Sequence, residues 1–327
     1  MRRLWWLVAV GVLLAGCTPT EANSSTTPTE PTIGSVATVS APQQVQFPID
    51  AYLPSLNQTV AIMMESLELL NKCLTQAGSV DTATLYIAST SGEKKQATPD
   101  DITAYVANVR SETVTYSPLW GFFNPQTAAT SAYDRPPGIG QGTLLLETPT
   151  GAVEQSCESR VASVTPGSGV AMPFTVSDLP DGGSPYQPND SRYVAAVSQW
   201  STCMHDQGFQ YATPQDAIGQ NLTVLGGETS SKAKAVAVAD VQCKVQVNLV
   251  GVAVAVQSAY DQIYIDSHRD QLAIMQTQFA AYIAGNVSVP VQEPSGSGSL
   301  TTAPSAPVTG ASTPDEVVAV PAALPSS

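Results

Sequence analysis

Four cysteines, which fall into two sets with similar surroundings, constrain the fold of this chain more than any other feature. The first set is Cys73 and Cys157, and the second is Cys203 and Cys243. Each set begins with the same short pattern, which is a Cys, a large apolar residue, three further residues and a Gly. An Ala-Thr-Pro-x-Asp stretch follows in both sets, and the second cysteine comes after it. Landmarks that recur in one order predict two diverged copies of a single unit.

Helix signals accompany the first cysteine of each set. Ser55 and Gln58 have the spacing of a capping box, and apolar residues follow at alternating steps of four and three, which predicts a buried helical stripe. In the first copy the stripe is Leu56, Val60, Met63, Leu67, Leu70 and Leu74. In the second copy Asp190 is the predicted cap, and the stripe is Tyr193, Val197, Trp200 and Met204. Gly78 and Gly208 are expected to end these helices in a left-handed conformation.

Further helices are predicted between and after the cysteines. A Thr-Pro pair at 98–99 and another at 213–214 each supply a cap and a first-turn proline. Two more helices are expected over 124–133 and around Cys157. We expect one long helix over 231–284, although its Val-rich middle is also compatible with a strand. Strand candidates are few, namely 84–88 and 143–146.

The predicted fold class is therefore mainly α, with two diverged disulfide-stapled helical repeats and a long C-terminal helix. The predicted divisions are a signal segment at 1–16, a flexible linker at 17–45, repeats at 46–178 and 179–287, and a disordered tail at 288–327. The linker and the tail are rich in Thr, Ser, Pro, Ala and Gly, so they bury too little apolar surface to offset the entropy of ordering. About 240 residues remain for the folded part.

The amino terminus has the layout of a secretory signal. Arg2 and Arg3 precede the uncharged run 4–14, and small residues lead from it into Cys17. The alternative is a transmembrane anchor, but these 11 residues are fewer than the roughly 20 that a spanning helix needs.

The stretch Leu14-Ala15-Gly16-Cys17 resembles the lipobox of bacterial lipoproteins at all four positions. The resemblance implies cleavage before Cys17, a lipid on its thiol and acylation of the new amino terminus. Palmitate is one such acyl group. Two or more acyl chains hold a protein on a bilayer almost permanently. We therefore expect a cell-membrane lipoprotein on the extracytoplasmic face, with the membrane as a partner through Cys17.

Outside the reducing cytoplasm, four remaining cysteines predict two disulfides. Three connectivities are open, and the repeat favours Cys73–Cys157 with Cys203–Cys243. The alternative is buried free thiols. A zinc site is not expected, because no Cys-x-x-Cys pair is present and only two histidines are available. No metal and no cofactor are predicted.

The charge balance excludes one class of partner. The formal net charge is −14, and it becomes −16 when the segment carrying Arg2 and Arg3 is removed. Such a chain repels nucleic acid, so no nucleic-acid partner is expected. An envelope protein or a cell-wall component is a candidate partner.

Residues with catalytic chemistry are scarce. His205 and His268 are the only histidines, and the first needs a nucleophile opposite it to act as an acid or base. Carboxylate pairs could cleave wall polysaccharide. The pairs available are Asp100 with Asp101, Asp178 with Asp181, and Asp261 with Asp266. Turn and capping roles explain most of these residues, so we predict no catalytic residue and no enzyme activity.

The aromatic segment 116–123 is the remaining candidate for a binding surface, through Trp120, Phe122 and Phe123. So many rings are either buried in the core or presented to a partner. Core packing between the repeats is the favoured alternative.

The second copy resembles a group of actinobacterial secreted proteins and lipoproteins. The resemblance rests on the runs 200–204, 208–211, 213–214, 237–243 and 259–260, with Trp-x-x-Cys-Met and Ala-Asp-x-x-Cys as its most specific elements. It spans about 200–264. It implies a helical, disulfide-linked domain and carries no established activity.

Three function classes follow from these observations. The favoured one is a lipid-anchored, non-catalytic envelope protein that binds a partner or has a structural role. The first alternative is a substrate-binding lipoprotein of a transporter, which usually alternates strands and helices around a cleft. The second is a carboxylate-dependent cell-wall hydrolase.

Overall fold

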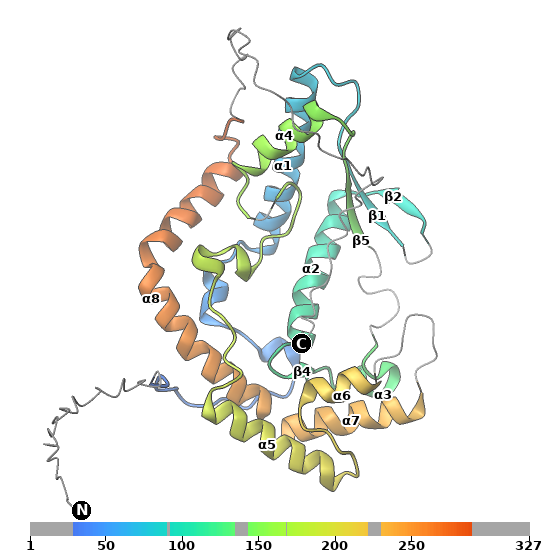
Figure 1. Ribbon diagram of the computed structural model, residues 1–327, viewed down its shortest axis with the longest axis vertical. Coiled ribbons are helices and arrows are strands. Elements are labelled where there is room, and N and C mark those ends of the chain that lie inside the picture. The colour runs from blue at the N-terminus through green and yellow to red at the C-terminus, as the bar shows by residue number, and fades with distance from the viewer. Residues whose placement is uncertain (1–28, 90–91, 135–142, 168, 222–229, 290–327) are drawn as a thin grey trace, which may run out of the picture. The chain divides into compact units, whose positions relative to one another are not determined.

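The computed structural model describes residues 29–89, 92–134, 143–167, 169–221 and 230–289 (Figure 1). By its contacts the chain divides into two units, Met1–Pro31 and Thr32–Ser327. The described residues of the first unit form neither helix nor strand, and every element below belongs to the second. Eight α-helices lie in the described part, which confirms the prediction of a mainly helical fold.

Helices α1 (Leu56–Gln76) and α2 (Pro99–Thr115) begin at the predicted caps. Ser55 Oγ accepts a hydrogen bond from the Gln58 amide, and Gln58 Oε1 accepts one from the Ser55 amide at 2.9 Å. Thr98 and Asp101 repeat this exchange before α2. Gly78, with φ +84°, follows the end of α1 as predicted.

The buried face of α1 is rotated from the predicted stripe. Leu56, Val60 and Leu67 are only partly buried. The side chains that the structure buries are Thr59, Ile62, Met63, Ser66, Leu69, Leu70, Cys73 and Leu74. The helix thus presents a broad face, because it packs on α2, α4 and α8 rather than on one neighbour.

A three-stranded antiparallel sheet has the order β2-β1-β5. Strands β1 (Thr84–Ala88) and β5 (Thr143–Glu147) are the two predicted ones, and Thr84 lies opposite Glu147. The third strand, β2 (Lys94–Gln96), was not predicted. All three of its residues are exposed and polar, so it carries no period-two apolar signal.

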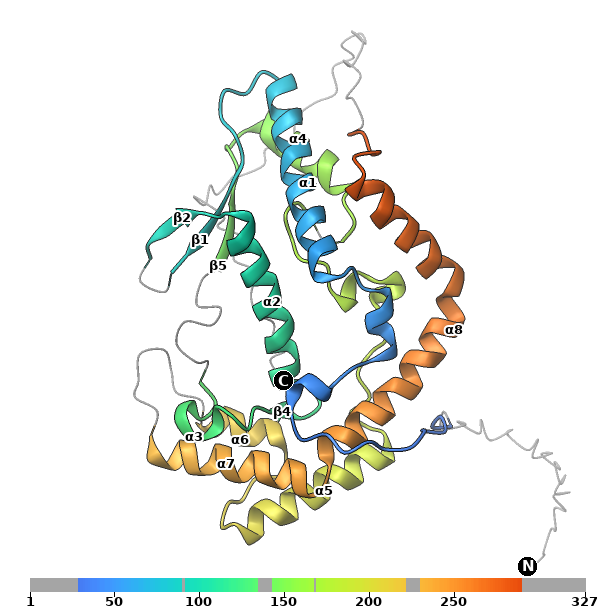
Figure 2. The same ribbon diagram turned by 180° about the vertical axis from the view of Figure 1, so that it is seen from behind.

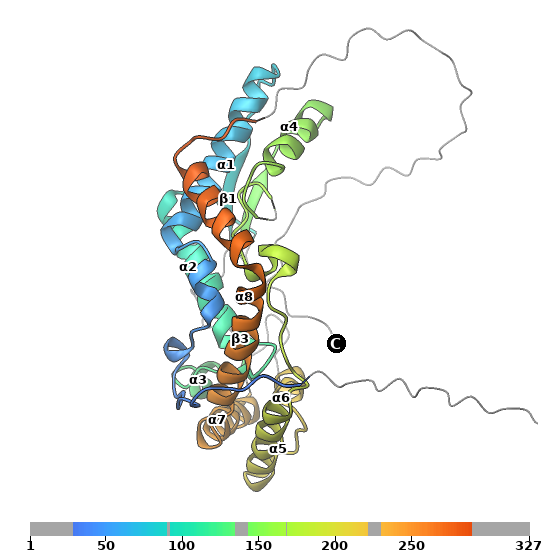
Figure 3. The same cartoon turned by 90° about the vertical axis from the view of Figure 1, so that its left-hand side faces the viewer.

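Disulfides join the predicted cysteine pairs. Cys73 on α1 is bonded to Cys157 on α4 (Ala152–Ala162), and Cys203 on α5 (Ser191–Asp206) is bonded to Cys243 on α7 (Ser231–Gln246). Helix α6 (Pro214–Asn221) packs on α7, and Figure 3 shows α5 and α7 at one end of α8 (Leu249–Ile283). Short 3₁₀ helices complete the described elements: η1 (Pro42–Gln44), η2 (Pro48–Tyr52), η3 (Val176–Asp178) and η4 (Pro180–Gly182).

The predicted helix over 231–284 is two helices. Asn248 has left-handed dihedral angles (φ 52°, ψ 38°) and separates α7 from α8, which are bent by 59°. Its side chain accepts a hydrogen bond from the Val39 amide at 3.1 Å and donates one to Ala37 O at 2.9 Å. Asparagine tolerates this conformation better than other side chains, and these contacts select it here.

Buried residues form two hydrophobic clusters. The first, here called the α1–α4 core, contains buried side chains of α1, α2, β1, β5 and α4 together with Tyr264, Leu272 and Phe279 of α8. The second, the α5–α7 core, contains those of α5, α6 and α7, the aromatic segment, and Leu249 and Val250 of α8. Figure 2 shows α8 passing from the end that holds α5 and α7 to the end that holds α1.

Neither core is built from one predicted repeat. Residues 119–133 precede the predicted boundary at 178/179 but belong to the α5–α7 core, whereas residues 264–282 follow it but belong to the α1–α4 core. The duplication and its boundaries stay predictions. A flexible linker was predicted up to residue 45. In the structure, Val39 and Val45 near the end of this segment are buried in the α5–α7 core.

Among the described residues, no single helix combines the length and apolar character needed to cross a membrane. The bent pair α7 and α8 passes that test only when the two helices are taken together.

Candidate functional site

The aromatic segment lies in the core. Strands β3 (Tyr116–Ser117) and β4 (Gly121–Phe122) form an antiparallel hairpin. The side chains proposed for binding, Trp120, Phe122 and Phe123, are each at most 1% exposed. Trp120 Nε1 donates a hydrogen bond to Val114 O at 3.0 Å, so its polar atom is also satisfied inside the protein. The structure therefore places these three residues in the interior, as the core-packing alternative expected, and not on a binding surface.

The residues that follow the hairpin form a short helix and a turn. The predicted helix over 124–133 is reduced to α3 (Ala128–Ser131), which ends at Ala132 with φ +52°. This turn brings the Tyr133 ring edge-on to Phe122, with centroids 5.4 Å apart. The Tyr133 hydroxyl thereby reaches the interior of the α5–α7 core.

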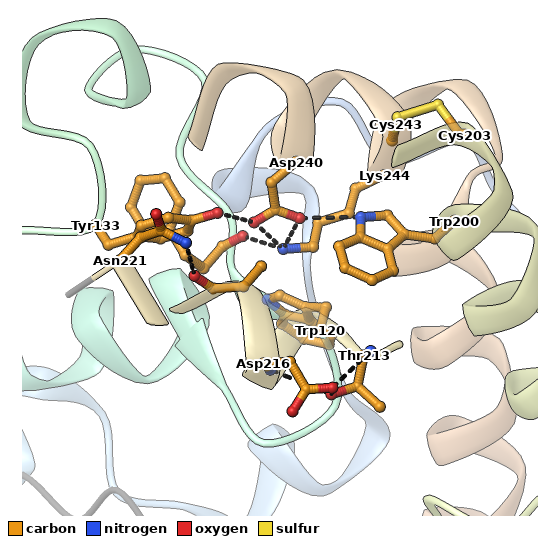
Figure 4. A network of polar contacts seen from close by, with 12 residues as sticks. Trp120, Tyr133, Trp200, Cys203, Thr213, Asp216, Asn221, Asp240, Cys243 and Lys244 are labelled. Carbon is orange, nitrogen blue, oxygen red and sulfur yellow. Dashed lines mark hydrogen bonds and ion pairs between the residues drawn. A yellow bond between two sulfur atoms is a disulfide. The ribbon is translucent and has the colours of Figure 1, made fainter. Parts of the chain in front are cut away.

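A buried ion pair lies at the centre of that core. Asp240 and Lys244 are four residues apart on α7, and both side chains are fully buried. Lys244 Nζ lies 2.7 Å from Asp240 and donates a second hydrogen bond to Phe122 O at 2.7 Å (Figure 4). The helix places residues i and i+4 on one face, so the pair needs no other element to form.

Two aromatic side chains complete the shell around Asp240. Trp200 Nε1 donates to Asp240 Oδ1 at 2.9 Å from α5. The Tyr133 hydroxyl donates to Oδ2 at 3.3 Å. Figure 4 shows these donors converging on Asp240 from different elements. The carboxylate thus accepts hydrogen bonds on both oxygens, which is what a buried charge requires.

Opposing effects set the ionisation of the pair. Burial raises the pKa of Asp240 and lowers the pKa of Lys244, because each charged form loses hydration. The opposite charge of the partner and the hydrogen bonds act against burial in both cases. Burial and the Asp240 charge also raise the pKa of Tyr133, so its hydroxyl stays a donor.

A lysine of this kind has a catalytic interpretation and a structural one. Amine nucleophiles in enzymes are often desolvated lysines. Catalysis also requires that a substrate reach the amine, and Lys244 is fully buried with its hydrogen bonds directed at Asp240 and Phe122 O. The arrangement therefore joins α5, α7 and the aromatic hairpin, and its chemistry is structural.

The second disulfide lies on the same helices. Cys243 directly precedes Lys244, and Cys203 lies one turn after Trp200 on α5. The covalent bond and the hydrogen bond from Trp200 to Asp240 therefore fasten α5 to α7 at neighbouring positions.

The two histidines are separate from this network. His205 is exposed near the end of α5, and its nearest charged neighbour is Asp206 at 3.8 Å. His268 interrupts the regular dihedral angles of α8, and its Nε2 lies 3.1 Å from Asp181 Oδ2. Its Nδ1 lies 2.8 Å from Tyr264 O, so the protonated ring can donate at both nitrogens.

Apart from the exposed Asp100, the carboxylates considered for hydrolysis have other partners. Asp101 caps α2, and Asp178 accepts hydrogen bonds from Thr175. Asp266 pairs with Arg269 at 2.8 Å. Asp261 is 1% exposed and belongs to a separate buried cluster. Within the described residues no group of three or more His, Cys, Asp or Glu could hold a metal ion.

Two open grooves lie on the described surface. One, of about 340 Å³, lies beside the α5–α7 core and is lined by small and apolar residues together with Gln207, Gln242 and Lys234. The other, of about 530 Å³, lies between α1 and the end of α8 and is lined in part by Glu65 and Glu68. Both carboxylates belong to α1 and lie three residues apart, and no motif in the sequence marks them.

The sequence contains a local signal for the ion pair. Asp240 and Lys244 are opposite charges at i and i+4 within an Ala- and Val-rich run, where a solvent-facing pair would be unusual. Nothing local indicated Tyr133 as a partner of Asp240, because the contact joins residues 107 apart.

Cys17, the predicted lipid attachment site, lies outside the described residues. No protein-family model, curated protein or solved structure matches this chain.

Proposed function

We propose that this chain is a lipid-anchored, extracytoplasmic envelope protein with a non-catalytic binding or structural role. The observation that carries the proposal is the run Leu14-Ala15-Gly16-Cys17 directly after an apolar segment that follows two arginines. The proposed attachment is a lipid on Cys17. The membrane is then a permanent partner of the protein.

The two disulfides support an extracytoplasmic location. Paired cysteines persist in oxidising compartments and are reduced in the cytoplasm of most cells. Each bond joins helices within one core, Cys73 to Cys157 and Cys203 to Cys243. They therefore fit a protein that keeps its fold outside the cell without help from a cofactor.

A non-catalytic role is supported by how the polar groups are used. The buried ion pair is saturated with hydrogen bonds, Asp101 caps α2, and Asp266 pairs with Arg269. Such groups are already bound and are not free to transfer protons to a substrate. The partner of the protein is proposed to be an envelope protein or a cell-wall component.

Metabolic labelling tests the anchor. The full chain is expressed in a bacterial host with radioactive palmitate, beside a Cys17→Ala variant. We expect label on the wild-type protein, its recovery in the membrane fraction, and neither result for the variant. A wild-type protein without label would overturn the anchor.

A second experiment separates binding from catalysis. Detergent-solubilised membranes are crosslinked and the protein is purified, and we expect one envelope component to copurify. Incubation of purified protein with cell-wall polysaccharide should release no fragments. Release that Glu65→Gln abolishes would favour the hydrolase alternative, because Glu65 lines the larger groove.

A further inference from the structure

Two buried oxygen atoms on α8 have no hydrogen-bond partner among the described residues. They are Gln257 Oε1 and Asp261 Oδ2. The two side chains lie one helical turn apart and are 3% and 1% exposed. Buried polar atoms are nearly always satisfied, so this pair of orphaned atoms needs an explanation.

The remaining atoms of the same two side chains are well bonded. Gln257 Nε2 donates to Asp261 Oδ1 at 2.8 Å, and it lies 3.2 Å from both Ser184 Oγ and Pro185 O. A carbonyl oxygen can only accept, so Pro185 O fixes which side of the Gln257 amide carries the hydrogens. Oε1 is therefore the acceptor atom of an amide whose Nε2 already bonds Asp261.

One proton satisfies both orphaned atoms. A protonated Asp261 carries a hydroxyl at Oδ2, which can donate to Gln257 Oε1 while Oδ1 still accepts from Nε2. The amide and the acid then form two hydrogen bonds in a closed ring. Without that proton, both oxygens stay buried acceptors to which no described residue donates a hydrogen bond.

We propose that Asp261 is protonated in the folded protein and forms a pH-sensitive latch with Gln257 that fastens α8 to the segment Ser184–Tyr186. The latch joins elements that are distant in sequence, because Gln257 bonds both Ser184 and Pro185. Ionisation of Asp261 leaves a buried negative charge beside Gln257 Oε1 and weakens this attachment.

The charges around the latch favour the protonated acid. Burial is the largest effect and raises the pKa of Asp261, and the carboxylate of Asp50 on η2 raises it further, while hydrogen bonding from Gln257, from Ser184 and from the Ile49 amide opposes the rise. The Tyr186 phenol lies within electrostatic reach of both carboxyls. Among the residues that the structure describes, no lysine, arginine or histidine acts on Asp261 to favour its charged form.

The other elements packed on α8 contain charged groups that have their own partners. Arg110 of α2 interacts with Asp50, and Asp190 pairs with Arg192 at the start of α5. Asp181 of η4 pairs with His268. The pH dependence of the latch is therefore expected to come from the ionisation of Asp261.

The direction of the pH effect follows from proton binding. An acid whose pKa is higher in the folded state binds more protons when folded than when unfolded. Folding stability from this group is therefore present at low pH and falls as the pH rises from the ordinary Asp value through the raised one. This is opposite to the behaviour of a salt-bridged Asp.

The test uses Asp261→Asn, whose amide donates to Gln257 Oε1 at every pH. The melting temperatures of wild type and variant are compared from about pH 5 to about pH 8. We expect Asp261→Asn to be the more stable protein at the upper end, with the gap closing toward the lower end. Asp270→Asn, an exposed position on the same helix, is the control and should keep the wild-type pH profile.

A measurement on the unaltered protein keeps the proposal testable if the variant folds poorly. The carbon-13 shift of Asp261 Cγ should report a protonated acid at about pH 5, where an ordinary Asp is ionised. A carboxylate shift there, or parallel pH profiles for wild type and Asp261→Asn, would overturn the latch. Stabilisation of wild type but not of the variant by calcium would also overturn it, since a cation would then occupy the site.

Discussion

Lys244 donates hydrogen bonds to Asp240 and to Phe122 O, and the two charged side chains are fully buried on one face of α7. The contact to Phe122 O links the helix to a hairpin more than one hundred residues earlier in the chain. The ion pair therefore contributes to tertiary structure as well as to the helix.

Loss of one member of this pair should be costly. Lys244→Met leaves Asp240 buried without its counter-charge, and such a change lowers the free energy of unfolding by about 3–5 kcal/mol. Chemical denaturation of wild type and variant measures the difference. Lys94→Met removes an exposed pair with Glu147 and serves as the control, with an expected change of about 0–1 kcal/mol. Equal effects of the two changes would contradict the assigned role.

Each disulfide should stabilise its own core. The bonds close sequence separations of 84 and 40 residues. The chain-entropy relation gives about 4.5 kcal/mol for Cys73–Cys157 and about 4 kcal/mol for Cys203–Cys243. The paired Cys→Ser variants are compared by chemical denaturation. If both paired variants unfold at the wild-type denaturant concentration, these bonds do not support the fold.

The backbone conformation and the side-chain hydrogen bonds of Asn248 should make separate contributions to the stability of the fold. Asn248→Ala loses the hydrogen bonds to Val39 and Ala37 and also adopts a left-handed conformation that costs an ordinary residue about 1–2 kcal/mol. Asn248→Gly loses the same hydrogen bonds without that strain. Thermal unfolding should therefore rank wild type above Asn248→Gly and Asn248→Gly above Asn248→Ala. An alanine variant as stable as the glycine variant would show that the turn is not strained.

The contact between His268 and Asp181 predicts a measurable titration. The hydrogen bonds to Tyr264 O and Asp181 raise the pKa of His268. Stability from this contact is present at low pH and is lost as the pH rises through the folded-state pKa. In Asp181→Asn the His268 ring should release its proton at lower pH, as followed by proton NMR. A His268 curve that Asp181→Asn leaves unchanged would exclude the pairing.

The sequence predicted those elements whose signals are local. Ser55 with Gln58 and Thr98 with Asp101 are capping pairs that depend on four consecutive residues, and both are present. The disulfide pairing was also predicted, because the repeated pattern selected one of three connectivities.

Elements that depend on distant contacts were missed. The break at Asn248 follows Val247 without a proline or glycine, and the contacts that select it come from residues more than two hundred positions earlier. Strand β2 depends on pairing with β1 and has no apolar residue of its own. The ion pair likewise acquires its role only when Tyr133 and Trp200 pack around it.

The sharing of α8 between both cores has a practical consequence for dissecting this protein. A recombinant fragment ending at residue 178 would keep the rings of Trp120 and Phe122 without α5 and α7 to cover them, and it would lack Leu272 and Phe279 beneath its own helices. Such a fragment would expose apolar surface to solvent and aggregate. Truncated fragments are therefore a poor means of mapping the partners of this protein.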